Sequence, residues 1–226
     1  MNYLITGTSS GLGKSLASNL YAQGHNIWGI SRSDSPSLNK SVKCDFSHLE
    51  SIEESLANLE LPTQIDCVIL NAGILGNLDK QEALSHYDYQ RVFNINFFAN
   101  KIIMDFLLDN HKVNLVLAVS SGAANKGYYG WGPYCCSKAA FKQLIECYSI
   151  ENPEIHFLNI APGLIKTKMQ DEIIQTSSEK IPSLSKFHAA YNSMCTPDAV
   201  AKKLLDNLDG LIDNNNSGAF TDLRDI

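Results

Sequence analysis

The chain has 226 residues, 44% of them hydrophobic, which suffices for one sizeable core but not for two ordinary domains. Its formal net charge of −6 provides no basic field to attract nucleic acid or an anionic membrane surface, so small molecules are the expected partners. No segment resembles a signal peptide, and no apolar run approaches the roughly 18 residues of a membrane span, so we expect a cytoplasmic protein without membrane contact.

Short apolar runs alternate along the chain with longer amphipathic stretches, a pattern typical of strands alternating with helices. This alternation predicts an α/β fold: a single Rossmann-like, doubly wound parallel sheet with helices on both faces, forming one domain over residues 1–226. The expected strands span residues 3–5, 26–30, 41–44, 66–70, 114–119, 155–160 and 219–221. The expected helices span residues 14–23, 49–59, 87–108 and 137–149.

A glycine-rich segment directly follows the first expected strand and leads into the first expected helix. Glycines there let the backbone turn tightly and approach a pyrophosphate, whose charge the amide N–H groups and the helix dipole stabilise. The glycine spacing differs from the general GxGxxG pattern by a longer first gap, and a plain Gly/Ser turn is the alternative. The strand–turn–helix context favours phosphate binding. The residues concerned are Gly7, Ser9, Ser10, Gly11, Leu12 and Gly13.

The end of the second expected strand bears on the choice of cofactor. A site that prefers NAD(H) usually has a carboxylate near this position to hold the ribose 2′-hydroxyl, and here Ser31 stands there, followed by Arg32. A guanidinium can pair bidentately with a 2′-phosphate. The sequence therefore favours NADP(H) over NAD(H), the alternative being a solvated loop arginine.

Polar residues with catalytic potential follow the fifth expected strand. Ser121 lies at its carboxyl end, and Tyr134 and Lys138, four residues apart, share one helix face. A free tyrosine titrates at about 10, and an ammonium about 4 Å away contributes roughly 4 kcal/mol at an effective dielectric of about 20. We therefore expect Lys138 to lower the pKa of Tyr134 by at most about three units, making it a general acid or base.

Six motifs in order, covering nearly the whole chain, resemble those of the short-chain dehydrogenase/reductase family. They are the TGxxxGxG loop at 6–13, the acidic position at Asp45-Phe46, Asn71-Ala72-Gly73, the asparagine segment ending at Asn96, the Ser121–Tyr134–Lys138 set, and PGxxxT at 162–167. The C-terminal segment is similar to that of the sepiapterin/benzil reductase branch.

The resemblance implies an NADP(H)-dependent reduction of a ketone or aldehyde. Tyr134 would protonate the carbonyl oxygen while NADPH delivers hydride, Ser121 would hydrogen-bond that oxygen, and Lys138 would hold the nicotinamide ribose. Asn96 would position a water in the proton relay. Further cofactor contacts are expected from Asp45, Phe46, Asn71, Ala72, Gly73, Pro162, Gly163, Ile165 and Thr167, besides Tyr134 and Lys138.

The substrate side is less well defined by the sequence. Residues 168–195 are polar and weakly periodic, and we expect them to form a mobile lid. Tyr128, Tyr129 and Trp131 fit either an apolar wall or ordinary packing, and His188 fits a surface position better than the pocket. The six cysteines lack the spacing of a metal site, which favours free thiols in a reducing compartment.

Two other functions fit the sequence less well. An idle NADP(H)-binding sensor or scaffold would keep the fold but could dispense with Tyr134 or Lys138, and both are present. A sugar-nucleotide epimerase or dehydratase on a related fold needs more chain after Pro162 for a substrate domain. The resemblance also implies a homodimer or homotetramer formed through the helices carrying Asn96 and Tyr134, and the apolar residues at 97–107 fit such an interface or packing on the sheet.

Overall fold

The computed structural model describes residues 1–35 and 38–226. Within these ranges, seven parallel strands form one sheet in the order β3-β2-β1-β4-β5-β6-β7. The predicted doubly wound α/β fold is confirmed, and every expected strand is present within about two residues of its predicted bounds. The strands are β1 (Asn2–Thr6), β2 (Asn26–Ser31), β3 (Lys40–Lys43), β4 (Gln64–Leu70), β5 (Lys112–Val119), β6 (His156–Ala161) and β7 (Phe220–Asp222).

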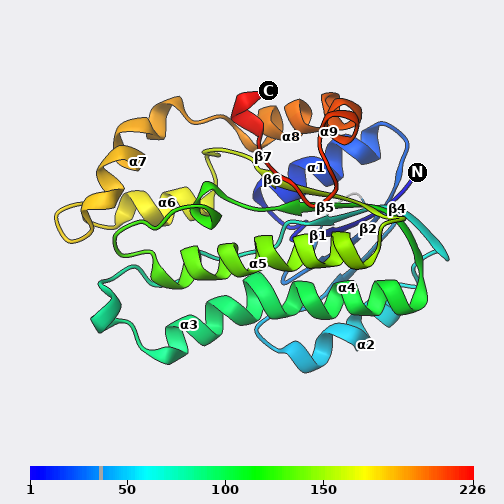
Figure 1. Cartoon of the computed structure of the whole chain (residues 1–226), viewed down its shortest axis with the longest axis horizontal. Coiled ribbons are helices and arrows are strands. Elements are labelled where there is room, and N and C mark those ends of the chain that lie inside the picture. The colour runs from blue at the N-terminus through cyan, green and yellow to red at the C-terminus, as the bar shows by residue number, and fades with distance from the viewer. Residues whose placement is uncertain (36–37) are drawn as a thin grey trace.

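Helices cover both faces of the sheet, and two further helices lie at one end of the molecule (Figure 1). No helix among the described residues is long and apolar enough to cross a membrane. One face carries α2 (Ile52–Ala57), α3 (His86–Phe93), α4 (Ala99–Asn110) and α5 (Gly132–Glu151). The other carries α1 (Gly11–Ala22), α8 (Pro197–Asp206) and α9 (Leu208–Asn214), while α6 (Lys168–Gln175) and α7 (Ser185–Ala190) lie at the end.

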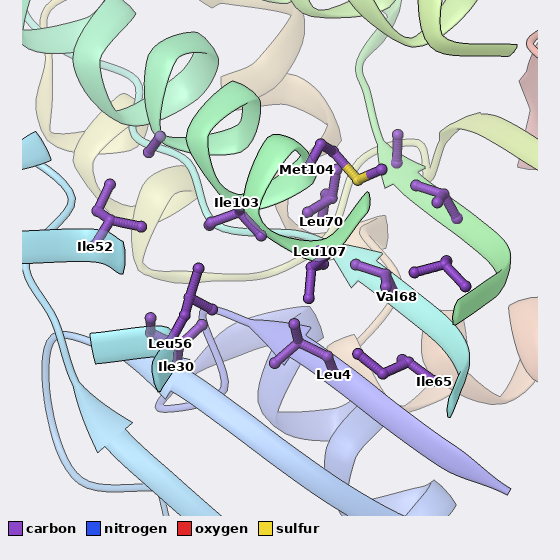
Figure 2. Close-up of a cluster of buried hydrophobic side chains, with 14 of the residues drawn as sticks. Leu4, Ile30, Ile52, Leu56, Ile65, Val68, Leu70, Ile103, Met104 and Leu107 are labelled. Carbon is purple, nitrogen blue, oxygen red and sulfur yellow. The ribbon is translucent and has the colours of Figure 1, made fainter. Parts of the chain in front are cut away.

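Strand β4 shows why the sheet is buried on both sides. Successive side chains of a strand point to opposite faces, so an unbroken apolar run supplies two cores at once. Val68 packs in the cluster beneath α4, with Leu4, Ile103 and Leu107 (Figure 2), while its neighbour Ile69 packs in the cluster on the α1 and α8 side. Each fully buried aliphatic side chain contributes about 1.5–3 kcal/mol to folding.

The helix predicted over residues 87–108 is interrupted. A capping box of Ser85 and Asp88 starts α3, and a π-helical turn over Asn94–Phe98 separates it from α4. A π turn inserts one residue into a helix without breaking its axis, and the apolar periodicity on either side gives no sign of it. The turn contains Asn96, whose side chain is fully buried.

The ends of two other predicted segments also differ from the structure. Helix α5 begins at Gly132 rather than at residue 137, because Pro133 occupies the first turn, where its missing N–H costs no hydrogen bond. Tyr134 therefore lies within the first turn of α5. Residues 168–195, expected as a lid with weak periodicity, contain α6 and α7, and their apolar side chains Ile173, Ile181 and Leu184 are buried.

Candidate active site

The candidate site lies where the strand order reverses. From β1 the chain proceeds outward to β2 and β3 and then returns to β4 on the other side of β1, which opens a crevice at the carboxyl ends of these strands. A cavity of about 410 Å³ lies there. Nineteen of the twenty-one predicted site residues line it: Gly7, Ser9, Ser10, Gly11, Leu12, Ser31, Arg32, Asp45, Phe46, Asn71, Ala72, Gly73, Ser121, Tyr134, Lys138, Pro162, Gly163, Ile165 and Thr167.

Gly13 is one of the two that do not line the cavity, and its role is in packing. A Cβ at this position would overlap the carbonyl oxygen of Gly7 and the side-chain amide of Asn71. That amide in turn donates to the Thr6 carbonyl at 3.0 Å, and the Thr6 hydroxyl accepts from the backbone N–H groups of Asn71 and Ala72. Gly13 thus lets α1 approach the seam that joins the loops after β1 and β4.

The loop after β1 has the backbone shape of a phosphate cradle. Gly7 and Gly11 adopt φ values of 75° and 57°, in the left-handed region that favours glycine. A Cβ at Gly11 would lie 3.3 Å from the Thr167 methyl group, so that the loop and the segment after β6 close on each other. Helix α1 begins directly after this loop and has no side-chain cap, so the N–H groups of its first turn are available to an anion.

Arg32 lies at the far end of the cavity, after β2. Among the described residues, no carboxylate lies within ion-pair distance of its guanidinium. The nearby Asp45 is stabilised mainly by the Ser47 backbone N–H, which lowers the pKa of its carboxyl, and Arg32 adds a smaller effect in the same direction. The Ser31 hydroxyl donates to the Ser33 carbonyl at 2.8 Å. The guanidinium is therefore available to an anion at this end.

Tyr134 and Ser121 meet at the chemical end of the cavity. Tyr134 is 7% exposed, and burial raises the pKa of its phenol, whereas the nearby Ser121 hydroxyl acts in the opposite direction. The Ser121 hydroxyl also accepts from the Ala123 N–H at 3.1 Å, which fixes its position. The expected lowering of the Tyr134 pKa by Lys138 is not found: burial is the largest effect on the phenol, and Lys138 is not among the groups that shift it.

Lys138 is itself buried, at 5% exposure, and burial lowers the pKa of its ammonium to about 8. Its Nζ donates to the Val119 carbonyl at 2.9 Å, at the end of β5. Two of its three N–H groups have no hydrogen-bond partner within the described part of the chain. Since Lys138 lines the cavity and a Cβ at Gly73 would lie 3.7 Å from Nζ, these groups are placed to hold a bound molecule.

Asn96 does not line the cavity, and its side chain is hydrogen-bonded to the protein itself. Its Nδ2 donates to the Ile74 carbonyl at 2.9 Å and to the Ser137 hydroxyl at 3.0 Å, and its Oδ1 accepts from the Ile74 N–H at 2.8 Å. With both amide hydrogens engaged and no surface exposed, the side chain has no N–H left for a relay water. Its place in the structure is that of a positioning residue.

The remaining cavity wall consists largely of residues that sequence reasoning missed. Trp131 stacks on Phe187 at 4.9 Å and meets Tyr134 edge-on at 5.9 Å, and Tyr128 lies beside both Trp131 and Phe187. Tyr129 and His188 lie outside the cavity, in line with the surface position favoured for the histidine. The missed residues on the substrate side are Leu75, Gly122, Ala123, Asp222 and Arg224, whereas Met169, Gln170, Ile173 and Phe187 belong to the segment 168–195 that was predicted to close the pocket.

Asp222 and Arg224 reach the cavity from far along the chain. Strand β7 pairs with β6, which sets Asp222 opposite Ala161, just before the Pro162-Gly163 segment. The Arg224 side chain then lies over Gly163 and pairs with Asp222 at 2.5 Å. The strand predicted at residues 219–221 was the one sequence feature that indicated this placement.

In the part of the chain that the structure describes, the cysteines and the other side chains that commonly bind metals do not gather into a metal site. No group of three or more His, Cys, Asp or Glu residues in the described ranges could hold a metal ion. All six cysteines are free, and three of them are buried.

Comparison with known proteins agrees with this geometry. Residues 2–178 match the family model described as short chain dehydrogenase. A benzil reductase ((S)-benzoin forming) of Bacillus cereus is 28% identical, over 89% of this chain and 91% of that protein, and an NADPH-dependent pterin aldehyde reductase of Arabidopsis thaliana is 28% identical over 96% and 91%. The crystal structure of a short-chain dehydrogenase/reductase from Saccharomyces cerevisiae superposes with a TM-score of 0.86 at 22% identity, covering 98% and 95% of the two chains.

Proposed function

The chain belongs to the short-chain dehydrogenase family and is therefore an oxidoreductase, and we propose that it is an NADP(H)-dependent carbonyl reductase in which Tyr134 is the general acid. The observation that supports this most strongly is the convergence of Ser121, Tyr134 and Lys138 at one end of a cavity. Its other end holds a glycine loop and Arg32, which has no ion-pair partner among the described residues. An elongated dinucleotide fits that arrangement of donors.

The chemistry follows from the protonation states of these groups. NADPH supplies the hydride for the carbonyl carbon. Because burial raises the pKa of Tyr134, its phenol is protonated at neutral pH and can donate to the carbonyl oxygen. Ser121 donates its one hydroxyl hydrogen to that oxygen and orients it. Lys138 holds the nicotinamide ribose through the two N–H groups that its bond to Val119 leaves free.

The preference for NADP(H) rests on Arg32 and Ser31. Within residues 1–35 and 38–226 the arginine has no carboxylate partner, and a serine stands where NAD(H) sites carry an acidic residue. This pair suits a 2′-phosphate better than a 2′-hydroxyl. The Arabidopsis relative is named for its use of NADPH, which supports the same choice.

The substrate is proposed to be a ketone that carries an aromatic ring. Tyr128, Trp131 and Phe187 supply flat apolar surfaces next to Tyr134, and such surfaces pack well against aryl groups. The Bacillus cereus relative, named for the reduction of benzil, supports this class.

Turnover with benzil tests the proposal directly. Oxidation of NADPH and, separately, of NADH is followed at the nicotinamide absorbance, and we expect turnover with NADPH. Tyr134→Phe should lose at least about 10²-fold in kcat while still binding NADPH. Tyr129 is 46% exposed and lies outside the cavity, so Tyr129→Phe is the matched control and should retain activity. Binding of NADPH without turnover on any carbonyl would indicate the idle sensor instead.

We also propose that the chain acts as one catalytic domain and assembles into a homodimer or homotetramer through α4 and α5. In α4, Ile103 and Leu107 pack against the sheet, whereas Phe106 remains partly exposed, and Phe98 just before the helix is 42% exposed. Light scattering after gel filtration should show a dimer or tetramer, and Phe98→Glu should shift it toward the monomer.

A further inference from the structure

Besides Tyr134, the phenol of Tyr128 also lies on the wall of the cavity. Its hydroxyl is 3.9 Å from the position that a Cβ would take at Gly122, so it lies over the residue next to Ser121. The same phenol is close enough to Tyr134 to contribute to the raised pKa there. In the described residues no side chain or backbone group hydrogen-bonds this hydroxyl.

The ring of Tyr128 is held from several sides. Its centroid lies 5.4 Å from that of Trp131 and 6.0 Å from that of Phe187, the latter edge-on. The ammonium of Lys186 lies 3.8 Å from the ring centroid and that of Lys126 lies 5.7 Å from it, both at cation–π distance. These contacts fix the ring and so fix the hydroxyl before anything binds, which lowers the entropic cost of using it for recognition.

A fixed hydroxyl without a partner beside the catalytic pair is a recognition group. A substrate that places an oxygen there gains a hydrogen bond, and one that places only carbon there leaves the hydroxyl unpaired once water has been displaced. The reacting carbonyl oxygen is held by Ser121 and Tyr134, and Tyr128 lies over the next residue along, Gly122. An oxygen that reaches Tyr128 is thus a second one, distinct from the reacting carbonyl oxygen, and the nearest that a substrate can offer is on the adjacent carbon.

We propose that Tyr128 donates a hydrogen bond to a second substrate oxygen, vicinal to the carbonyl that is reduced, so that the enzyme selects 1,2-diketones and α-hydroxy ketones over simple ketones. This proposal rests on the proposed carbonyl reductase function. It makes Tyr128 a specificity-determining residue, distinct from Tyr134, which protonates the product.

The test compares benzil with deoxybenzoin, which has the same two phenyl rings but lacks one carbonyl oxygen. Tyr128→Phe keeps the ring and its cation–π contacts and removes only the hydroxyl. We expect kcat/KM for benzil to fall about tenfold, which is the effect of one neutral hydrogen bond, and that for deoxybenzoin to change less than about threefold. If deoxybenzoin turns over too slowly, its inhibition constant against benzil is compared between the same two enzymes.

Tyr129→Phe serves as the control, since it removes a hydroxyl from the adjacent tyrosine outside the cavity and should change neither substrate. An equal loss on benzil and deoxybenzoin would show that Tyr128 acts by packing alone, and undiminished activity on benzil would show that its hydroxyl is not used. Either result overturns the proposal while leaving the carbonyl reductase intact. Failure of the wild-type enzyme on every carbonyl would instead overturn the proposed function.

Discussion

The side-chain amide of Asn96 pairs with both backbone polar groups of Ile74. Oδ1 accepts from the Ile74 N–H at 2.8 Å, and Nδ2 donates to the Ile74 carbonyl at 2.9 Å. These two hydrogen bonds join the π-helical turn after α3 to the loop after β4. Gly73 of that loop lines the cavity beside Lys138. The Asn96 amide thus holds this part of the cavity wall in place from outside the cavity. Its removal should lower the stability of the protein and disturb the geometry of the site.

Asn96→Ala leaves the Ile74 N–H and carbonyl and the Ser137 hydroxyl without this partner in a fully buried position. Unpaired buried groups cost about 1–3 kcal/mol each, partly relieved by water, so we expect the free energy of unfolding to fall by about 2–4 kcal/mol. Urea titration measures the change. Asn110→Ala, which removes an exposed amide from the end of α4, is the control and should cost well under 1 kcal/mol. Equal effects of the two variants would show that the Asn96 pairing contributes nothing specific.

Gly13→Ala should damage the cofactor end of the site. The new methyl group would overlap the Gly7 carbonyl and the Asn71 side chain, and a backbone group can yield only if α1 shifts. We expect a loss of about 2 kcal/mol or more in stability and weaker NADPH binding, measured by urea unfolding and by fluorescence titration. Gly210→Ala in α9 has open space around it, with the nearest atom 3.9 Å away, and should be neutral or stabilise by up to about 1 kcal/mol. A Gly13→Ala variant that binds NADPH normally would contradict the packing role of this glycine.

Residues close in sequence to a strand end could be placed from the sequence, because parallel strands bring their carboxyl ends to one edge. Gly7, Ser31, Asn71 and Ser121 all follow strands whose apolar runs were visible, and all line the cavity. The local patterns that predict strands therefore also predicted most of the cofactor end.

The substrate end could not be placed in this way. The helices α6 and α7 have few apolar residues. These residues are buried because they pack in one cluster with Trp131 and Tyr134, which are distant in sequence. Arg224 reaches the cavity only because β7 joins the sheet beside β6. The side-chain pairing of Asn96 with Ile74 depends on a π turn that no periodicity announces. Each of these placements is decided by tertiary contacts, which a single sequence does not display.

Arg32→Ala should weaken the binding of NADPH much more than that of NADH. If the guanidinium holds the 2′-phosphate, its loss removes charge-assisted hydrogen bonds worth about 1.5–3 kcal/mol, so the Kd for NADPH should rise about 10- to 100-fold. The Kd for NADH, which has no phosphate there, should change less than about threefold. Arg91→Ala, an exposed arginine on α3 outside the cavity, is the control. An equal weakening of NADPH and NADH binding would rule out the 2′-phosphate contact.

Lys138→Met should stabilise the protein while abolishing turnover, because a buried ammonium is costly. Burial lowers the pKa of Lys138 from its ordinary 10.5 to about 8, which corresponds to a destabilisation of the folded protein by roughly 3 kcal/mol. The substitution also removes the hydrogen bond to Val119, which offsets about 1 kcal/mol of the expected gain. We therefore expect a gain of about 2 kcal/mol at pH 7, measured by urea unfolding. Lys142→Met, one turn further along α5 and partly exposed, is the control and should change little.

The pH dependence of this gain has a definite sign. Below pH 8 Lys138 is protonated in both the folded and the unfolded protein, so the whole cost of burial is present. Between about 8 and 10.5 the unfolded chain still binds the proton that the folded protein has released, and the wild type gains stability as the pH rises. The advantage of Lys138→Met should therefore shrink between pH 7 and pH 9.5. An advantage that stays constant over this range would show that the ammonium is not destabilised by its burial, and that Lys138 is held at its ordinary pKa by charges around the site.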